Sequence, residues 1–463
     1  MFTGKDLIEA GYQPGKWFAG AIETANALLA DGASRETVIA AMAELAPPPV
    51  RPLDAIDSKP LHVNIEAGNE AEAENVAAVL ASMRALLRTP VVKAGAAMPD
   101  ACPAGPNGTI PVGGIAVSEA IHPGMHSADI CCSMAYTNFG SADPKLLLDA
   151  VHKVTHFGPT ERAVPVEMPA ELGRSIENHG LLEPHAVMAR RHFATQGDGN
   201  HFAYVGTLAS TGDTILVTHH GSRGLGARLY ASGMRIAERY RQRLSPETLK
   251  QNAWIPADTA EGEAYWAALQ IVREWTRANH FALHDLAAEI TGGTIEDRFW
   301  NEHNFVFRKS DGLFYHAKGA TPAFDGWAAD ATDLTIIPLN MAEPILIVRG
   351  ADADHGLGFS PHGAGRNMSR TAHKRGLGER AHAEIFAEET AEIDARFFCG
   401  KIDVSELPSA YKNAGSVREQ IGRYGLAEVV DEVIPHGSIM AGDWEHDAPW
   451  RKRREAKRKA QER

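Results

Sequence analysis

Apolar side chains recur at helical spacing in the first part of the chain. They mark residues 22–29 and again residues 38–42, which follow Ser34, a preferred residue for a helix N-cap. The proline-rich stretch 47–52 cannot continue a helix and forms a stiff connector. The pattern predicts an N-terminal helical unit, a main domain and a C-terminal tail, over residues 1–50, 53–445 and 446–463 respectively.

The pattern that follows alternates between strand and helix. A strand over 61–65 precedes a helical pattern over 70–87, which Thr89-Pro90 ends, and a second strand over 91–95 comes next. Strand, helix and strand in so short a stretch favour a mixed α/β architecture. Residues 99–114 are rich in Gly and Pro and predict little regular structure, which inside a compact domain is typical of a functional loop.

Two long helices are predicted in the middle of the chain. The apolar strand 214–218 runs into His219, and Gly224 opens an amphipathic helix that ends near Leu244. A second helical region, over 261–289, is rich in Ala, Trp and Leu, and this composition indicates packing.

The second of these helices carries two histidines four residues apart. His280 and His284 have the helical spacing of a metal-binding pair. Phe281, Leu283 and Leu286 surround them, so a structural role is the favoured interpretation and ligation is the alternative.

Composition argues against several classes of protein. The 463 residues are 44% hydrophobic, enough for a large core, and no stretch approaches the roughly 20 apolar residues of a membrane span. The N-terminus lacks the pattern of a secretory signal, so we expect a cytoplasmic protein. Four cysteines are too few for a disulfide framework.

The formal net charge of -13 argues against a general nucleic-acid coat protein, although RNA remains an acceptable substrate because binding depends on local charge. The tail over 451–463 is the basic exception. A solvated, frayed helix and a contact to a phosphate backbone are equal alternatives for it.

Four short segments hold side chains that bind metals. Asp129 and Cys132 lie three residues apart, His201 lies in a Gly-rich segment, His219 ends an apolar strand, and His303 precedes a further strand pattern. Taken singly, each has a structural explanation as a turn cap, a small buried hydrophobe or a satisfied core histidine. Together they supply one carboxylate, one thiolate and three imidazoles, enough for two metal ions if the thiolate bridges them. Such mixed ligands fit Mn, Zn, Co or Fe.

A sixth functional candidate, His362, lies in the loop 360–366 after an apolar run over 344–350. Glycines on its C-terminal side let backbone N–H groups approach a phosphate closely, and Arg366 has a guanidinium that can hold phosphate oxygens in a bidentate fork. Taken alone, the loop favours a histidine in a surface turn, and a histidine that attacks phosphorus is the alternative that gains support from the other histidine motifs.

The order of these motifs resembles the RtcB family of RNA-splicing ligases. The motifs are Asp-x-x-Cys, Gly-Asn-His-Phe, His-x-Gly-Ser-Arg-Gly, His-Asn-Phe-Val and His-Gly-Ala-Gly-Arg, and the likeness covers roughly residues 60–442. Further matches are Met98-Pro99-Asp100, Lys318-Gly319-Ala320, Met368-Ser369-Arg370 and Ala410-Tyr411-Lys412.

The resemblance implies a mixed α/β core of central β-sheets surrounded by helices. It also implies a reaction, dependent on Mn²⁺ and GTP, that joins RNA ending in a 2′,3′-cyclic phosphate or 3′-phosphate to RNA with a 5′-hydroxyl, in tRNA splicing or RNA repair. RNA is the implied substrate, and an archease-type activator is an implied partner.

The resemblance also assigns roles to the metal ligands. Cys132 would bridge two Mn²⁺ ions. His219 and His303 would complete one site, and Asp129 and His201 would complete the other.

For the nucleotide, the resemblance makes His362 the nucleophile that attacks the α-phosphorus of GTP and carries GMP as a phosphoramidate. The residues expected to contact the nucleotide are Asn200, Phe202, Asn304, Pro338, Asn340, Met341, Gly363, Ala364, Gly365, Arg366 and Tyr411.

The chain departs from the family pattern mainly where guanine is recognised. Tyr204 stands in place of a glutamate, Ile345 in place of a serine and Ala441 in place of a lysine, while Cys102 replaces a histidine. A site loses discrimination when its buried polar partners are removed, so guanine specificity is an open question. The alternatives are a metal-dependent hydrolase of cyclic phosphate ends, a ligase with changed nucleotide specificity, and a non-catalytic binding protein with a relic metal site.

Overall fold

The computed structural model describes residues 1–46 and 49–444, so the predicted basic tail lies outside the described residues. The chain forms two compact units. One comprises Met1–Pro52 with the short segment Gln242–Pro246, and the other comprises Leu53–Arg241 and the chain from Glu247 onward.

The N-terminal unit consists of three helices, α1 (Gly4–Glu9), α2 (Trp17–Ala30) and α3 (Arg35–Leu45). Ser34 caps α3, as predicted, because its side chain accepts a hydrogen bond from the backbone N–H of Thr37. The unit has a small core of its own, made of Phe2, Leu7, Ala21, Ala25, Val38 and Met42.

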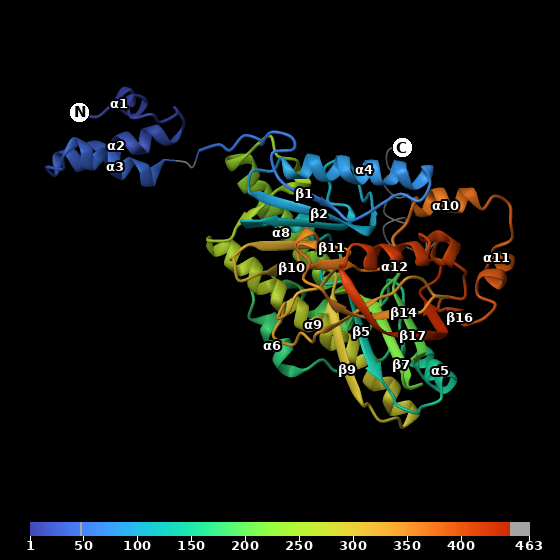
Figure 1. Ribbon diagram of the computed structural model, residues 1–463. Coiled ribbons are helices and arrows are strands. Elements are labelled where there is room, and N and C mark those ends of the chain that lie inside the picture. The colour runs from blue at the N-terminus through green and yellow to red at the C-terminus, as the bar shows by residue number, and fades with distance from the viewer. Residues whose placement is uncertain (47–48, 445–463) are drawn as a thin grey trace, which may run out of the picture. The chain divides into compact units, whose positions relative to one another are not determined.

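The larger unit begins with a five-stranded sheet whose strand order is β1-β2-β3-β11-β10. Helix α4 (Glu70–Leu87) packs against β2, on the predicted boundaries (Figure 1). The strands are β1 (Leu61–Val63), β2 (Val92–Cys102), β3 (Val112–Ser118), β10 (Asn304–Arg308) and β11 (Phe314–Lys318).

A second sheet has the strand order β13-β14-β17-β6-β7-β5-β9, and β16 joins it beside β17. Its end strands β13 and β9 lie close together, and the backbone N–H of Ile336 donates to Asn301 Oδ1 at 2.9 Å, so the sheet is nearly closed. The strands are β5 (Ser133–Asn138), β6 (Phe202–Leu208), β7 (Thr214–His220), β9 (Asp297–Glu302), β13 (Leu334–Ile337), β14 (Ile345–Gly350), β16 (Asp394–Phe397) and β17 (Ala427–Met440).

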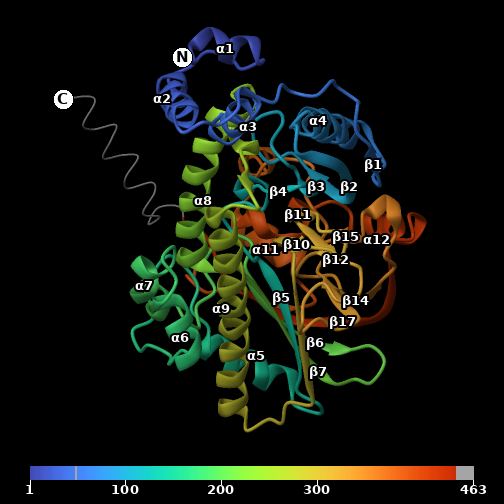
Figure 2. The ribbon, with the colours of Figure 1, turned by 90° about the vertical axis from the view of Figure 1, so that its left-hand side faces the viewer.

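Helices cover the outside of the nearly closed sheet. Helix α9 (Ala260–Thr291) runs along β5 and β7 (Figures 1 and 2), and α5 (Pro144–Val154) packs against α9, β6 and β17. The remaining elements are α6 (Ala170–Glu177), α7 (Ala186–Arg191), α8 (Arg223–Leu244), α10 (Arg370–Gly376), α11 (His382–Glu389) and α12 (Ala414–Arg423), with β4 (Ala120–Ile121) paired to β8 (Ile255–Pro256) and β12 (Ala320–Pro322) paired to β15 (Phe359–Pro361). The mixed α/β prediction is confirmed.

Two local predictions differ from the structure. The first strand stops at Val63, and the segment 99–114 contains more regular structure than its Gly and Pro content suggests, because β2 continues to Cys102 and β3 begins at Val112. The register of β2 with β3 shifts between Ala97 and Cys102. This irregularity accommodates Pro99, which has no N–H for a ladder hydrogen bond.

The antiparallel order of the second sheet brings several strand ends to one edge. His219 near the end of β7 pairs with Phe202 at the start of β6 and with Met134 near the start of β5, while Ser133 pairs with Glu302 at the end of β9. Residues that flank these ends therefore converge although they are far apart in sequence. Among the described residues, no helix combines the length and apolar character needed to cross a bilayer.

Candidate active site

The five predicted metal ligands form one cluster at this edge. Cys132 Sγ lies 3.1 Å from His219 Nε2 and 3.6 Å from His201 Nε2. His219 Nε2 lies 3.2 Å from His303 Nε2, and His201 Nε2 lies 3.3 Å from Asp129 Oδ2. Cys132 belongs to both groups of donors, one with His219 and His303 and one with Asp129 and His201. A thiolate at this position can bridge two ions.

Two of the imidazoles are oriented by backbone carbonyl groups. The Nδ1 atom of His219 lies 3.1 Å from the Asn200 carbonyl oxygen, and that of His201 lies 2.5 Å from the Gln196 carbonyl oxygen. Each carbonyl accepts a hydrogen bond from Nδ1–H, which leaves a lone pair on Nε2 that faces the thiol. Outer partners of this kind fix the tautomer and orientation of metal-binding histidines.

The electrostatics of the cluster fit a divalent cation. Burial lowers the pKa of His219 to about 3, and burial together with neighbouring imidazoles lowers the pKa of His303 well below its usual value. Burial also raises the pKa of Cys132 well above that of an exposed thiol. Neutral imidazoles with facing lone pairs repel one another, so a cation between them would remove the repulsion and stabilise the thiolate.

His362 follows β15 and faces the same cluster. Its Nδ1 atom lies 2.6 Å from Asp100 Oδ2, and its backbone N–H donates to the same oxygen at 3.2 Å. Asp100 is fully buried at the irregularity in β2. Because Asp100 holds the proton on Nδ1, the lone pair is on Nε2. The His362 ring centre lies 4.9 Å from that of His303.

Two glycines allow neighbouring segments of backbone to lie close to His362 and Asp100. A Cβ atom on Gly319 would lie 2.8 Å from His362 Cε1. Gly365 has a φ of +71°, and a Cβ there would lie 1.9 Å from the Asp100 carbonyl oxygen. Side chains at either position would displace His362 or Asp100.

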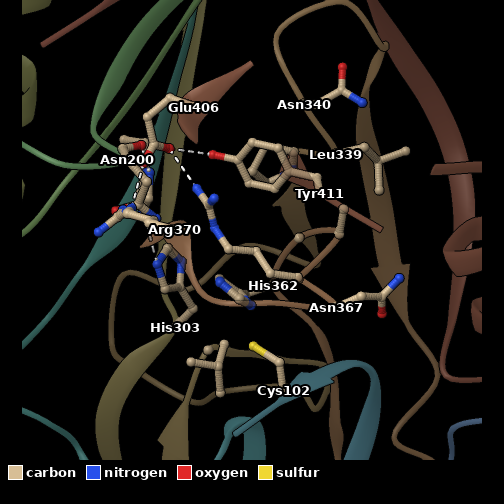
Figure 3. A pocket seen from close by; sticks show the side chains of 18 of the residues that line it. Cys102, Asn200, His303, Leu339, Asn340, His362, Asn367, Arg370, Glu406 and Tyr411 are labelled. Atoms are coloured by element: carbon tan, nitrogen blue, oxygen red, sulfur yellow. Dashed lines mark hydrogen bonds and ion pairs between the residues drawn. The ribbon is translucent and has the colours of Figure 1, made fainter. Parts of the chain in front are cut away.

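A cavity of about 670 Å³ connects the cluster with the His362 loop (Figure 3). This volume is within the ordinary range for small-molecule sites. His201 contacts Cys132 and Asp129 but does not line the cavity. The predicted residues that line it are Asp129, Cys132, Asn200, Phe202, His219, His303, Asn304, Pro338, Asn340, Met341, His362, Gly363, Ala364, Gly365, Arg366 and Tyr411.

The predicted phosphate ligand Arg366 is engaged by protein groups. It donates to the Ser405 carbonyl oxygen at 2.5 Å and to Glu406 Oε2 at 2.8 Å, and its guanidinium lies over the Tyr411 ring at 4.4 Å. Arg370 Nε and the Tyr411 hydroxyl also donate to Glu406, at 2.7 and 2.6 Å (Figure 3). One carboxylate thus holds two guanidinium groups, which leaves a positive charge at the cavity wall.

The prediction of site residues missed three groups that the structure places here. Asp100 and Arg370 were present in motifs of the family pattern, so the pattern carried a signal for them. Glu406 had no such signal, because its role depends on contacts with two arginines far away in sequence.

The structure places each of the four residues that depart from the family pattern. Tyr204 lines the cavity but its hydroxyl donates to the Val433 carbonyl oxygen at 2.9 Å. Ile345 is fully buried in the same wall. Ala441 follows β17 directly and packs in the apolar cluster that includes side chains of α5. Cys102 lines the cavity near His362.

His280 and His284 pack behind the cluster. His280 lies within hydrogen-bond distance of Ser133 and Thr218 hydroxyls, and His284 lies within hydrogen-bond distance of Thr218 and Thr137 hydroxyls. Within the described part of the chain neither belongs to a group able to hold a metal, which supports the structural interpretation.

Comparison with known proteins agrees with the resemblance that the sequence motifs indicate. The sequence model of the family described as tRNA-splicing ligase RtcB matches residues 173–441. The tRNA-splicing ligase RtcB of Pyrococcus horikoshii is 27% identical over 312 residues, which cover 57% of this chain and 36% of that protein.

Two further relatives give similar values. The tRNA-splicing ligase RtcB of Thermococcus kodakarensis is 27% identical, with 57% of this chain and 64% of the relative covered. The RNA-splicing ligase RtcB of Mycobacterium bovis is also 27% identical, with 52% and 63% covered. The aligned region thus spans between about a third and just under two thirds of these relatives.

The family match covers more than half of the chain and contains four of the five motifs, including those of His201, His219, His303 and His362. The convergence of these motifs at one cavity agrees with the match. The chain belongs to the RtcB family.

Proposed function

We propose that the protein is an RNA ligase that joins a 3′-phosphate or 2′,3′-cyclic phosphate end to a 5′-hydroxyl end through a nucleotidyl-histidine intermediate. The observation that carries this proposal is the placement of His362. Asp100 holds its Nδ1 proton, and the ring lies in a cavity beside five metal-binding side chains.

The donor set fits two divalent ions, for which Mn²⁺ is the expected metal. Cys132 would be shared, with His219 and His303 on one side and Asp129 and His201 on the other. Bound there, divalent ions neutralise phosphate charge and polarise phosphoryl oxygens.

His362 supplies the nucleophile of the first step. Its Nε2 lone pair attacks the α-phosphorus of a nucleoside triphosphate, a P–N bond forms, and the bond to the pyrophosphate oxygen breaks. The product is a nucleotidyl-imidazole that still carries the Nδ1 proton. Asp100 stabilises the positive charge that develops on this ring, so no separate base is needed. GTP is the co-substrate that the resemblance implies.

The later steps return His362 to its free state. The RNA 3′-phosphate attacks the nucleotidyl phosphorus and breaks the P–N bond, which gives an activated RNA end. The 5′-hydroxyl then attacks the RNA phosphorus and the nucleoside monophosphate leaves. A cyclic end must first be hydrolysed to the 3′-phosphate. The positive wall formed by Arg366 and Arg370 suits the phosphates of these intermediates. An archease-type protein is the expected activator.

The test is intact-protein mass after incubation with Mn²⁺ and each of the four ribonucleoside triphosphates. We expect one adduct of nucleoside monophosphate mass in the wild type and none in His362→Ala. His355→Ala is a matched control, because His355 is exposed and its Nε2 atom contacts the Tyr424 backbone outside the cavity. An adduct that persists in His362→Ala would overturn the nucleophile assignment.

The same preparation separates ligation from hydrolysis. We expect RNA with a 2′,3′-cyclic phosphate end to be joined to a 5′-hydroxyl RNA when the nucleotide is present. If the cyclic end is opened to a monophosphate but no joined product and no adduct form with any nucleotide, the protein is a hydrolase and the ligase proposal fails.

A further inference from the structure

One part of the cavity wall, which begins beside His219 with Phe202 at a ring-centre distance of 5.3 Å, offers a surface for a planar base. Its floor is made of two cross-strand pairs on the inner face of the nearly closed sheet, Phe202 with Met440 and Tyr204 with Ser438. The loop between β13 and β14 adds Asn340 and Met341 (Asn340 is labelled in Figure 3). We call these six residues the base slot.

Most of the base slot cannot pair with the polar edge of a base. Phe202, Met341 and Met440 offer ring or thioether surface. The Tyr204 hydroxyl donates to the Val433 carbonyl oxygen at 2.9 Å, with the Glu343 carbonyl oxygen at 3.3 Å, so it is occupied by backbone groups.

Two side chains retain hydrogen-bonding capacity. Ser438 is 1% exposed, and its hydroxyl has no hydrogen-bond partner among the described residues. Asn340 Oδ1 accepts from the Ala342 backbone N–H at 2.9 Å, which leaves its Nδ2 group for a ligand. The base slot therefore presents one amide donor and one hydroxyl that can donate or accept.

Glu406, a carboxylate of the cavity lining, is not available to a base. Glu406 is 1% exposed and already accepts hydrogen bonds from Arg366, Arg370 and Tyr411. A base edge that offers two adjacent N–H donors would need this carboxylate or an equivalent acceptor pair, and the six slot residues contain no acid.

The two purines place different demands on these groups. Guanine has an N1–H and a 2-amino group side by side, so its Watson–Crick edge needs two acceptors. Adenine has an acceptor at N1 and a donor at the 6-amino group, which match one donor and one acceptor. A buried donor without a partner loses its hydration with no compensation.

From this match we infer that the base slot selects adenine over guanine, so that the nucleotide bound beside His362 is an adenosine phosphate. The inference rests on the proposed function, because it assigns the slot to the base of the nucleotide that His362 attacks. Asn340 Nδ2 donates to adenine N1, and Ser438 Oγ accepts from the 6-amino group.

The test is equilibrium binding of nucleoside monophosphates by calorimetry without added metal. Monophosphates cannot form the adduct, so binding is measured apart from catalysis. We expect AMP to bind about tenfold more tightly than GMP, because one donor of guanine stays unpaired. We expect 2-amino-AMP to bind more weakly than AMP, since the added amino group meets apolar side chains. GMP binding as tightly as AMP, or 2-amino-AMP binding equal to that of AMP, would overturn the inference.

A pair of variants locates the selectivity. Ser438→Ala is expected to weaken AMP binding about fivefold and to leave GMP binding nearly unchanged, because one neutral hydrogen bond is lost. Thr335→Val is the control, since Thr335 also has a buried hydroxyl without a partner among the described residues but lies outside the cavity lining. An unchanged preference for AMP in Ser438→Ala would contradict the assignment of Ser438.

The outcomes separate this inference from the proposed function. A GMP adduct on His362 combined with preferential GMP binding keeps the ligase and removes the adenine selectivity. Preferential AMP binding without an adduct from any triphosphate keeps the selectivity of the slot and removes the ligase.

Discussion

The metal ligands and the base slot line adjoining parts of the cavity wall, here called the metal end and the base end, and they differ in how their side chains are held. At the metal end, polar donors lie at strand ends, and backbone carbonyls or a buried carboxylate orient the imidazoles of His201, His219 and His362. At the base end, most side chains belong to the inner wall of the sheet, and Tyr204 directs its hydroxyl to the backbone. A catalytic end needs each donor in a fixed position, whereas the base end tolerates replacement as long as the wall stays packed.

The largest effect should come from removing the shared thiol. Cys132→Ala leaves both donor groups incomplete, so we expect the Mn²⁺ stoichiometry to fall from two ions to fewer than one and all joining activity to be lost. The measurement is metal content after dialysis, together with AMP binding. AMP binding should persist because Cys132 is outside the base slot.

Cys399→Ser is the control for this variant, since Cys399 is a free cysteine outside the cavity lining. Retention of two tightly bound ions by Cys132→Ala would show that the thiol does not bridge them. The metal end would then tolerate replacement of a donor, as the base end does.

Asp100→Asn should have the next largest effect. The amide is uncharged and cannot stabilise the positive ring that forms on nucleotidylation, so we expect the rate of adduct formation to fall about 10²- to 10⁴-fold with little change in nucleotide affinity. Single-turnover rates over a range of nucleotide concentrations measure both quantities. A rate close to that of the wild type would mean that Asp100 serves folding alone.

¹⁵N resonances of the His362 ring provide a readout of the tautomer. In the wild type we expect the proton on Nδ1, where Asp100 accepts it. Asn367→Ala, which removes another polar group from the cavity lining, should leave the tautomer unchanged.

A smaller effect is expected at the base end. Tyr204→Phe leaves the Val433 carbonyl oxygen without its side-chain donor, so we expect the free energy of unfolding to fall by about 1 to 3 kcal/mol. Denaturant unfolding measures this, and Mn²⁺ stoichiometry should not change. Tyr136→Phe gives a comparison, because Tyr136 belongs to the same apolar cluster. A loss of Mn²⁺ in Tyr204→Phe would show that metal binding depends on the base end as well, which contradicts the expected independence of the two parts.

A further effect, confined to alkaline pH, is expected at Lys318, which lines the cavity. Burial lowers the pKa of Lys318 to about 8. In the unfolded chain the group titrates near 10.4, so between about pH 8 and pH 10.4 the unfolded state binds more protons and this residue makes stability rise with pH. We expect Lys318→Met to remove that rise, as measured by unfolding at several pH values. The same slope in both proteins would contradict the burial of a titrating ammonium.

Sequence predicted much of the fold in this protein. The helix over residues 70–87 and the cap at Ser34 agree with the structure because both depend on local patterns. The irregular end of β2 was not predicted, since its strand character comes from pairing with β3 and not from its own Gly, Pro and Ala content.

Some residues of the candidate site could be predicted from the sequence, whereas the contacts between them could not. The five metal ligands and His362 stand in short motifs, so their identity could be recognised without coordinates. The pairing of His362 with Asp100 and the pairing of Arg366 with Glu406 could not be predicted from local sequence, because the partners lie 262 and 40 residues apart.

The sequence by itself determined which chemical groups are available: one carboxylate, one thiol and four imidazoles in Gly-rich or strand-end positions, and an apolar pattern that alternates strand and helix. The tertiary structure decided how these groups meet. The strand order of the second sheet places β17 beside β6, so Ser438 and Met440 share a wall with Tyr204 and Phe202. That register depends on long-range pairing, in which side-chain direction is set by the neighbouring strand, and no local pattern specifies it.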